Sequence, residues 1–194
     1  MPTVSIVIIG DEILKGTFRE ANADWLIQTF RDVGCRVLRV AVIPDVVEEI
    51  ALEVRRTAKH SDWVVTTGGV GPTHDDVTHR GIADAFGVPV VLHQEFADMM
   101  RAWGLEEGTA LTQMATLAEG TEILVGGNAK FPVLRCQNVF VLPGIPSLVR
   151  EKMTSILHCF VGEHPARAQL RLEGRETTHA ALIHALAEQC PEVV

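Results

Sequence analysis

The stretch Thr66-Thr-Gly-Gly-Val-Gly-Pro-Thr-His-Asp-Asp-Val-Thr78 directly follows a short apolar segment of the chain. Trp63 to Thr66 has the β-branched, apolar composition of a buried strand, and Thr78 to Phe86 has helical spacing that Gly87 closes. The glycines between them have no Cβ and adopt positive φ readily, so consecutive backbone N–H groups can surround an anion. The stretch therefore predicts a phosphate-binding loop between a strand and a helix.

Two adjacent carboxylates, Asp75 and Asp76, lie in the same stretch. A phosphate repels a carboxylate unless a metal ion lies between them or a substrate group is being deprotonated or hydrogen-bonded. The pattern therefore indicates a site for a phosphorylated ligand with a divalent cation. A plain turn is the alternative for the glycines alone, because their spacing matches neither the dinucleotide fingerprint nor the P-loop.

Strand-like and helix-like segments alternate along the first part of the chain. Val4 to Ile9 and Arg36 to Ile43 read as strands, and each is followed by an amphipathic helical stretch. This Rossmann-type alternation predicts right-handed crossovers and a three-layer α/β fold with a mostly parallel sheet. Further patterns predict strands at Val88–Leu92 and Glu122–Val125, helices near Gln94–Trp103, Thr112–Leu117 and Ile145–Phe160, and a hairpin of Val133–Cys136 with Val139–Leu142.

Candidate ligand groups follow several strands of this sheet. Ligands of open parallel sheets bind beyond the carboxyl ends of the strands, where the strand order reverses. A 2-1-3 order would place Asp11 and Glu12 opposite Asp75 and Asp76, and four neighbouring carboxylates favour a bound metal. The turn Leu142 to Ser147 also follows a strand and opens a helix, so its backbone amides could join the anion site.

Single residues at this edge have local interpretations that compete with a role in the site. Asp45, after the second strand, and Asp76 could each be the N-cap of the helix that follows. Lys15 could pair with phosphate or be a surface residue, and His74 could be a ligand or a solvated loop residue. The pair His79-Arg80 is expected to form the exposed first turn of a helix.

Composition narrows the class of protein. The chain has 194 residues and a net charge of -8, with 25 acidic and 17 basic residues and no basic stripe, which argues against a nucleic-acid partner. Its four cysteines form no C-x-x-C pair, so neither a zinc site nor a redox dithiol is indicated. No segment approaches the ~20 apolar residues of a membrane span. We therefore expect a cytoplasmic protein without a membrane partner.

Together these motifs resemble the MoaB/Mog molybdopterin-binding domain, in particular the branch at the N-terminus of CinA-type proteins and eukaryotic FAD synthases. The resemblance covers roughly Val4 to Phe160, and its most specific part is the string Gly-Gly-Val-Gly-Pro-Thr-His-Asp-Asp-Val-Thr. The hairpin region is more similar to the FAD synthases. The motifs that carry the resemblance are Gly10–Gly16, Asn22, Pro44-Asp45, Gly68–Thr78 and Leu142–Pro146.

The resemblance implies a pterin or nucleotide phosphate at the Gly-rich loop, assembly as a dimer or trimer, and catalytic roles for Asp76 and Asp45. CinA-type and FAD synthase relatives are associated with metal-dependent, cobalt-favouring hydrolysis of the diphosphate in ADP-ribose or FAD. The expected ligands of a magnesium or cobalt ion are Asp11, Glu12, Asp75 and Asp76. The expected ligand-binding residues are Gly68, Gly69, Gly71, Thr73, Thr78, Gly144, Ser147 and Lys15.

Three functions follow as hypotheses: a metal-dependent nucleotide diphosphatase, a molybdopterin or flavin nucleotide binding module without turnover, and a molybdopterin adenylyltransferase. The third ranks lowest. Residues 1–160 are expected to form the molybdopterin-binding-like domain, and residues 161–194 the start of a small βα subdomain with a strand at Gln169–Leu172 and a helix at Ala180–Ala187. Gly126–Pro132 departs from the Gly-rich loop with Pro-Gly-Phe of CinA-type relatives, which leaves ligand choice there open.

Overall fold

Six strands form the main sheet of the computed structural model, in the order β2-β1-β3-β8-β7-β6. Strand β1 (Thr3–Ile9) pairs in parallel with β2 (Arg36–Ile43) and β3 (Trp63–Thr67), and β3 pairs in parallel with β8 (Val139–Leu142). The hairpin adds β7 (Val133–Cys136) and β6 (Glu122–Leu124) antiparallel. The sheet has the 2-1-3 order that would bring the loops after β1 and β3 together, and the predicted mostly parallel α/β sheet is confirmed.

The structure describes residues 1–106, 108–124, 132–163 and 173–190. The chain divides into two units, Met1–His164 and Pro165–Val194. In the second unit, helix α8 (Glu176–Gln189) includes the predicted helix Ala180–Ala187, whereas the predicted strand Gln169–Leu172 and most of the departing segment Gly126–Pro132 lie outside the described residues.

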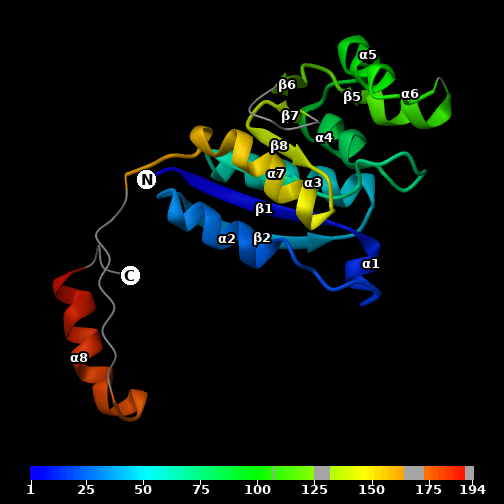
Figure 1. Cartoon of the computed structure of the whole chain (residues 1–194). Coiled ribbons are helices and arrows are strands. Elements are labelled where there is room, and N and C mark those ends of the chain that lie inside the picture. Colours follow the sequence, from blue (N-terminus) through cyan, green and yellow to red (C-terminus); the bar gives the residue numbers. More distant parts are fainter. Residues whose placement is uncertain (107, 125–131, 164–172, 191–194) are drawn as a thin grey trace. The chain divides into compact units, whose positions relative to one another are not determined.

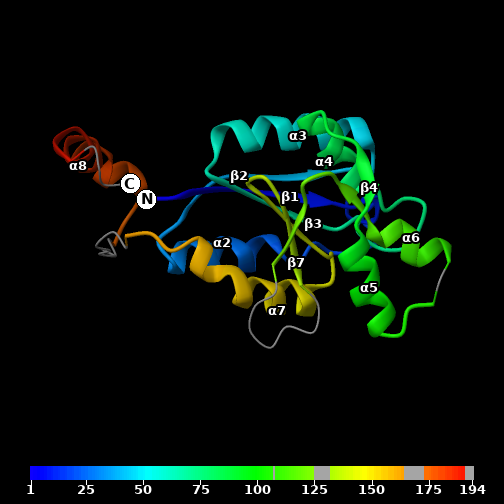
Figure 2. The same cartoon turned by 90° about the horizontal axis from the view of Figure 1, so that it is seen from above.

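Helices cover both faces of the main sheet, so the first unit has three layers (Figures 1 and 2). On one face, α2 (Ala23–Asp32) and α7 (Pro146–Ile156) bury a core that includes three phenylalanine rings, of which Phe30 and Phe160 meet edge to face at 5.0 Å. On the other face, α3 (Val47–His60) and α4 (Thr78–Phe86) pack closely because Gly81 leaves room for Ile50.

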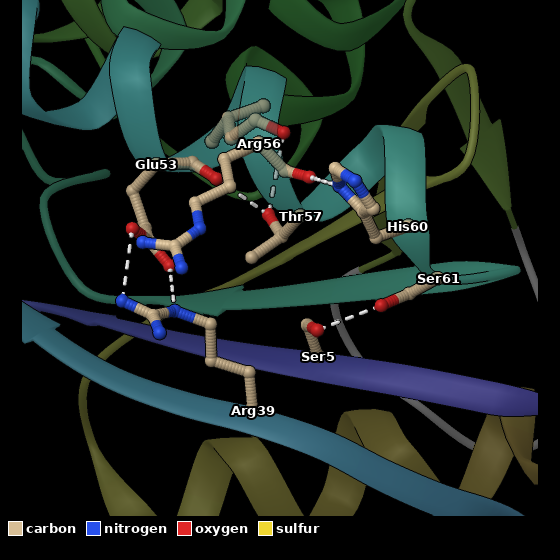
Figure 3. A network of polar contacts seen from close by, with 8 residues as sticks. Ser5, Arg39, Glu53, Arg56, Thr57, His60 and Ser61 are labelled. Carbon is tan, nitrogen blue, oxygen red and sulfur yellow. Dashed lines mark hydrogen bonds and ion pairs between the residues drawn. The ribbon is translucent and has the colours of Figure 1, made fainter.

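Polar contacts fasten α3 to the sheet (Figure 3). Arg39 of β2 donates through Nε to Glu53 Oε1 at 2.5 Å, and the hydroxyls of Ser5 and Ser61 share a buried hydrogen bond of 2.7 Å. The Thr57 hydroxyl donates to the carbonyl of Glu53 within the helix. These contacts lie at the face of the sheet, and the cleft described below lies at its carboxyl edge.

The segment between α4 and β6 differs from its sequence-based prediction. Strand β4 (Val90–Leu92) pairs antiparallel with β5 (Thr116–Ala118) in a separate two-stranded sheet. The helix predicted over Thr112–Leu117 therefore begins and ends earlier, as α6 (Thr109–Ala115), because its last residues extend to pair with β4. Helix α5 (Gln94–Ala102) precedes it as predicted.

The long helix predicted over Ile145–Phe160 is shorter in the structure. Its α-helical part, α7, begins at Pro146 and ends at Ile156, and a 3₁₀ turn, η1 (Leu157–Cys159), follows. No helix in the described ranges has both the length and the apolar character needed to cross a membrane.

Candidate functional site

A cleft opens at the carboxyl edge of β1, β3 and β8, where the sheet topology predicts a ligand site. Its volume is about 730 Å³, within the roughly 300–1,000 Å³ of typical small-molecule sites. The walls come from the end of β1, the loop before α2, the Gly-rich loop and the turn after β8. Much of the lining is apolar, including Ile9, Phe18, Val70, Met114 and Ile145.

Gly68 holds the Gly-rich loop against the sheet. Its φ of 99° is in the region that favours glycine, and a Cβ there would lie 2.0 Å from the Ile9 carbonyl oxygen. Its N–H donates to the Leu142 carbonyl at 3.1 Å. The prediction that the Gly68 N–H binds an anion is therefore wrong, because this N–H already donates to β8. Gly68 lines the cleft, but its role is to hold the loop in place against the sheet.

The next three residues present free backbone donors to the cleft. Within the described residues, the N–H groups of Gly69, Val70 and Gly71 have no hydrogen-bond partner, and all three residues line the cleft. Thr78 braces the loop from behind, because its N–H donates to the Gly69 carbonyl at 3.0 Å and its hydroxyl to the Gly68 carbonyl at 2.8 Å. Consecutive unpaired N–H groups of this kind form an anion-binding concavity.

Asp76 anchors the far side of the loop and faces the cleft. Its Oδ2 accepts the N–H of Thr73 at 2.8 Å and also the Thr73 hydroxyl, while the helix begins with Val77 as its N-cap. Asp76 therefore does not cap α4. Asp75 is exposed and does not line the cleft; the nearby Thr73 hydroxyl lowers its pKa. His74 is also exposed. Only Asp76 of these three side chains lines the cleft.

Asp45 joins the loop after β2 to the loop after β1. Its Oδ2 accepts the N–H of Asp11 at 2.8 Å, and Val46 is the N-cap of α3, so the prediction that Asp45 caps this helix is wrong. Burial raises the pKa of Asp45, and the Asp11 N–H opposes the rise. A Cβ on Gly69 would lie 3.1 Å from Asp45 Oδ1, so this half-buried carboxylate lies directly behind the Gly-rich loop.

Lys15 belongs to a surface ion pair. Its ammonium donates to Asp11 Oδ2 at 2.7 Å, which lowers the pKa of Asp11 and raises that of Lys15. Neither residue lines the cleft, whereas Glu12 of α1 (Asp11–Leu14) does. The structure therefore brings Glu12 and Asp76 to the cleft but keeps Asp11, Asp75 and Lys15 outside its lining.

The turn after β8 forms another wall of the cleft, next to the Gly-rich loop. Gly144 lines the cleft and approaches the Gly-rich loop, since a Cβ there would lie 3.5 Å from the Gly68 Cα. The buried Asn22 side chain donates to the Gly144 carbonyl at 2.8 Å and so ties this turn to the start of α2. Ser147 is exposed and lies outside the lining.

Several residues of the cleft lining were not predicted as site residues from the sequence, among them Arg19, Glu20 and Thr67. Arg19 is the only lysine or arginine in its lining and has no ion pair with any described residue. Thr67 has a buried hydroxyl without a partner in the described part of the chain. Thr67 lies directly before the glycines, and this position could have indicated a role in the site. Arg19 lies in a loop without a periodic pattern, so its sequence context gives no such indication.

The carboxylates do not form a ready-made metal site. In the described ranges, no three histidine, cysteine, aspartate or glutamate side chains come close enough together to hold a metal ion. The predicted four-carboxylate cage therefore does not fit. A cation carried by a diphosphate needs only one or two carboxylates, because magnesium usually takes its other ligands from substrate phosphates and water. Of the four predicted ligands, Glu12 and Asp76 are the two that line the cleft.

The chain therefore has an α/β fold with a cleft at the sheet edge that is lined by unpaired backbone amides, by Arg19 and by the carboxylates Glu12, Glu20 and Asp76. The family described as "Probable molybdopterin binding domain" matches residues 5–162, so the chain belongs to this family. It is 36% identical over 167 residues to a "Probable FAD synthase" of Caenorhabditis briggsae. That match covers 74% of this chain and 32% of the relative, so the chain spans about a third of that protein.

Solved structures agree with this assignment. The crystal structure of CinA from Thermoplasma acidophilum, described as having unknown function, is 26% identical, with a TM-score of 0.74 over 82% of this chain and 99% of CinA. The molybdopterin biosynthesis enzyme MoaB of Thermus thermophilus is 22% identical, with a TM-score of 0.52 over 82% of this chain and 94% of MoaB, and shows a shared fold. The predicted resemblance to MoaB/Mog, CinA and FAD synthase proteins is confirmed.

Proposed function

We propose that the cleft binds a pterin or nucleotide through its phosphate groups and that the protein hydrolyses the diphosphate of FAD or ADP-ribose. The observation that carries the binding proposal is the row of unpaired N–H groups at Gly69, Val70 and Gly71. Arg19 adds a positive charge and Thr67 a free hydroxyl, and the apolar walls suit a flat ring. The similarity to a FAD synthase supports a flavin or adenine nucleotide as the ligand.

In the proposed reaction, water attacks one phosphorus, the bridging P–O bond breaks, and two monophosphates leave. FAD would give FMN and AMP. The backbone amides of residues 69–71 hold one phosphate, and Glu12 and Asp76 are the carboxylates that would hold a divalent cation. Such a cation polarises a phosphoryl oxygen or lowers the pKa of a bound water. Asp45 supports the loop from behind, as a positioning residue.

Chromatography of the reaction products tests this proposal. The purified protein is incubated with FAD or ADP-ribose, with and without cobalt or magnesium, and its melting temperature is measured with each ligand. Metal-dependent release of AMP supports the diphosphatase. A raised melting temperature without release would leave a binding module. No release and no stabilisation by either ligand would contradict both functions. An adenylyltransferase would instead consume ATP, and no contact in the cleft favours it.

We expect Arg19→Gln to weaken binding of ADP-ribose by about tenfold at low salt, because a hydrogen bond to a charged group contributes about 1.5–3 kcal/mol and solvent reduces it here. Lys15→Gln is the matched control, since Lys15 pairs with Asp11 outside the cleft lining. It should change the affinity by less than about twofold. Calorimetric titration measures both, and equal losses for the two variants would contradict the role of Arg19.

Assembly and location stay predictions. Residues Leu38, Val40 and Val42 of the edge strand β2 are exposed, and an uncovered edge strand favours association of two copies. We infer a homo-oligomer, a dimer or trimer, which light scattering with size-exclusion chromatography tests. A cytoplasmic location is likewise an inference from composition.

A further inference from the structure

A second cavity of about 410 Å³ adjoins the cleft across the Gly-rich loop. The two cavities share part of their walls, namely Gly69, Val70, Gly71, Asp76 and Met114. The free N–H groups of the loop therefore lie at the junction of two compartments. A ligand whose phosphates bind at this junction can extend to both sides.

The second compartment has a polar wall where the first is largely apolar. Helix α6 contributes Thr109, Thr112 and Gln113, and Thr116 follows it. The Gln113 side-chain amide donates to the Thr73 carbonyl, which ties α6 to the Gly-rich loop. Hydroxyl and amide groups can both donate and accept hydrogen bonds, so this wall suits an uncharged polar group.

The buried side chain of His79 on α4 is evidence for a ligand in this compartment that is independent of the shape and polarity of the cavity. It lines this compartment with only 8% of its surface exposed, which corrects the prediction that it lies in an exposed helical turn. Neither ring nitrogen has a hydrogen-bond partner in the part of the chain that the structure describes. Buried polar atoms normally have a hydrogen-bond partner, so two buried ring nitrogens without one indicate a ligand or an ordered water at this position.

The charge state of His79 narrows the chemistry of that ligand. Burial lowers the pKa of His79 to about 4, so the ring is neutral near pH 7, with one donor and one acceptor nitrogen. Asp76 and the exposed Arg80 are the charged residues of the wall. The opposite charges of Asp76 and Arg80 give this wall no net charge, and the neutral imidazole offers one donor and one acceptor, so the compartment favours an uncharged group with hydrogen-bonding edges.

We propose that the second compartment, with His79 in its wall, binds the uncharged heteroaromatic ring of one half of a two-ring diphosphate, while the first compartment binds the other half. The ring contacts His79 directly or through one ordered water. This inference rests on the proposed function and narrows its ligand to a dinucleotide such as FAD, in place of a pterin monophosphate. The half that enters each compartment is left to the experiment.

The test compares the affinities of FAD, FMN and AMP, measured by calorimetry without divalent cations so that no turnover occurs. The variants are His79→Leu and Thr112→Val, with Thr154→Val as control because Thr154 bonds its own helix on α7, away from both cavities. Wild-type protein should bind FAD at least tenfold more tightly than either half. Each site variant should lower the affinity for FAD and for either FMN or AMP by roughly tenfold. The affinity for the other of these two halves should stay unchanged.

The outcomes separate the two proposals. His79→Leu should keep or raise the melting temperature, because it removes unpaired buried polar atoms. Unchanged affinity for FAD in both site variants, or equal affinity of wild-type protein for FAD and one half, would overturn the second compartment alone. Failure of wild-type protein to bind any of the three probes would overturn the proposed function as well. If His79→Leu does not fold, the exposed Thr112→Val decides between these outcomes.

Discussion

Gly68→Ala is expected to lower the free energy of unfolding by about 2–5 kcal/mol, since a left-handed φ costs an ordinary residue about 1–2 kcal/mol and overpacking about 1–3 kcal/mol. The added methyl would lie 2.0 Å from the Ile9 carbonyl oxygen, so β1 and the loop after β3 must move apart. Binding of ADP-ribose should be lost with the shape of the loop. Urea unfolding and calorimetry measure the two effects.

The variant Gly104→Ala is a control that separates the cost of a positive φ from the cost of a steric clash. Gly104 has a φ of 91°, similar to the 99° of Gly68, but a Cβ there meets nothing within 4 Å. Its replacement should cost only about 1–2 kcal/mol and leave ligand binding unchanged. Equal stability losses at the two positions would show that the close packing of the Gly-rich loop on Ile9 does not hold the cleft together.

Asp76→Asn is expected to reduce hydrolysis of FAD or ADP-ribose by roughly 100-fold or more, a common loss when a positioned catalytic group is removed. The asparagine oxygen can still accept the Thr73 N–H, so the loop keeps its anchor while the carboxylate charge is lost. Asp76→Ala removes both the carboxylate charge and the acceptor of the Thr73 N–H, so it should also weaken binding of the nucleotide. Initial rates of AMP release compare the three proteins.

Binding gives a second measurement on the same variant. Without a divalent cation, Asp76→Asn should bind ADP-ribose more tightly than wild-type protein, because a carboxylate at the phosphate site is repulsive. With magnesium or cobalt the order should reverse, because a metal ligand is missing. Wild-type rates in Asp76→Asn, together with affinities that do not depend on the cation, would remove Asp76 from the site.

Much of the fold was predictable because its strands and helices repeat regular patterns. Apolar runs such as Val4–Ile9 and the helix closed by Gly87 are local signals, and the structure confirms both. The β4–β5 pair was not predictable, since three-residue strands form only through their tertiary pairing. For the same reason, α6 ends before the residues that periodicity assigned to a helix.

The site was predictable at its glycines and less so at its side chains. Gly69 and Gly71 line the cleft, and their role in phosphate binding stays a prediction. The position of Asp45 depends on a hydrogen bond from the N–H of Asp11, which local capping rules cannot reveal. His79 was misjudged although it shares a helical face with Ile82 and Phe86, a spacing that indicates burial.

A crystal structure of the protein soaked with ADP-ribose tests phosphate binding at the Gly-rich loop most directly. We expect a phosphate oxygen within hydrogen-bond distance of the N–H groups of Gly69, Val70 or Gly71, with Arg19 beside the diphosphate. ADP-ribose bound with its phosphates away from these amides, or no bound ligand at concentrations that saturate the protein in solution, would contradict the account.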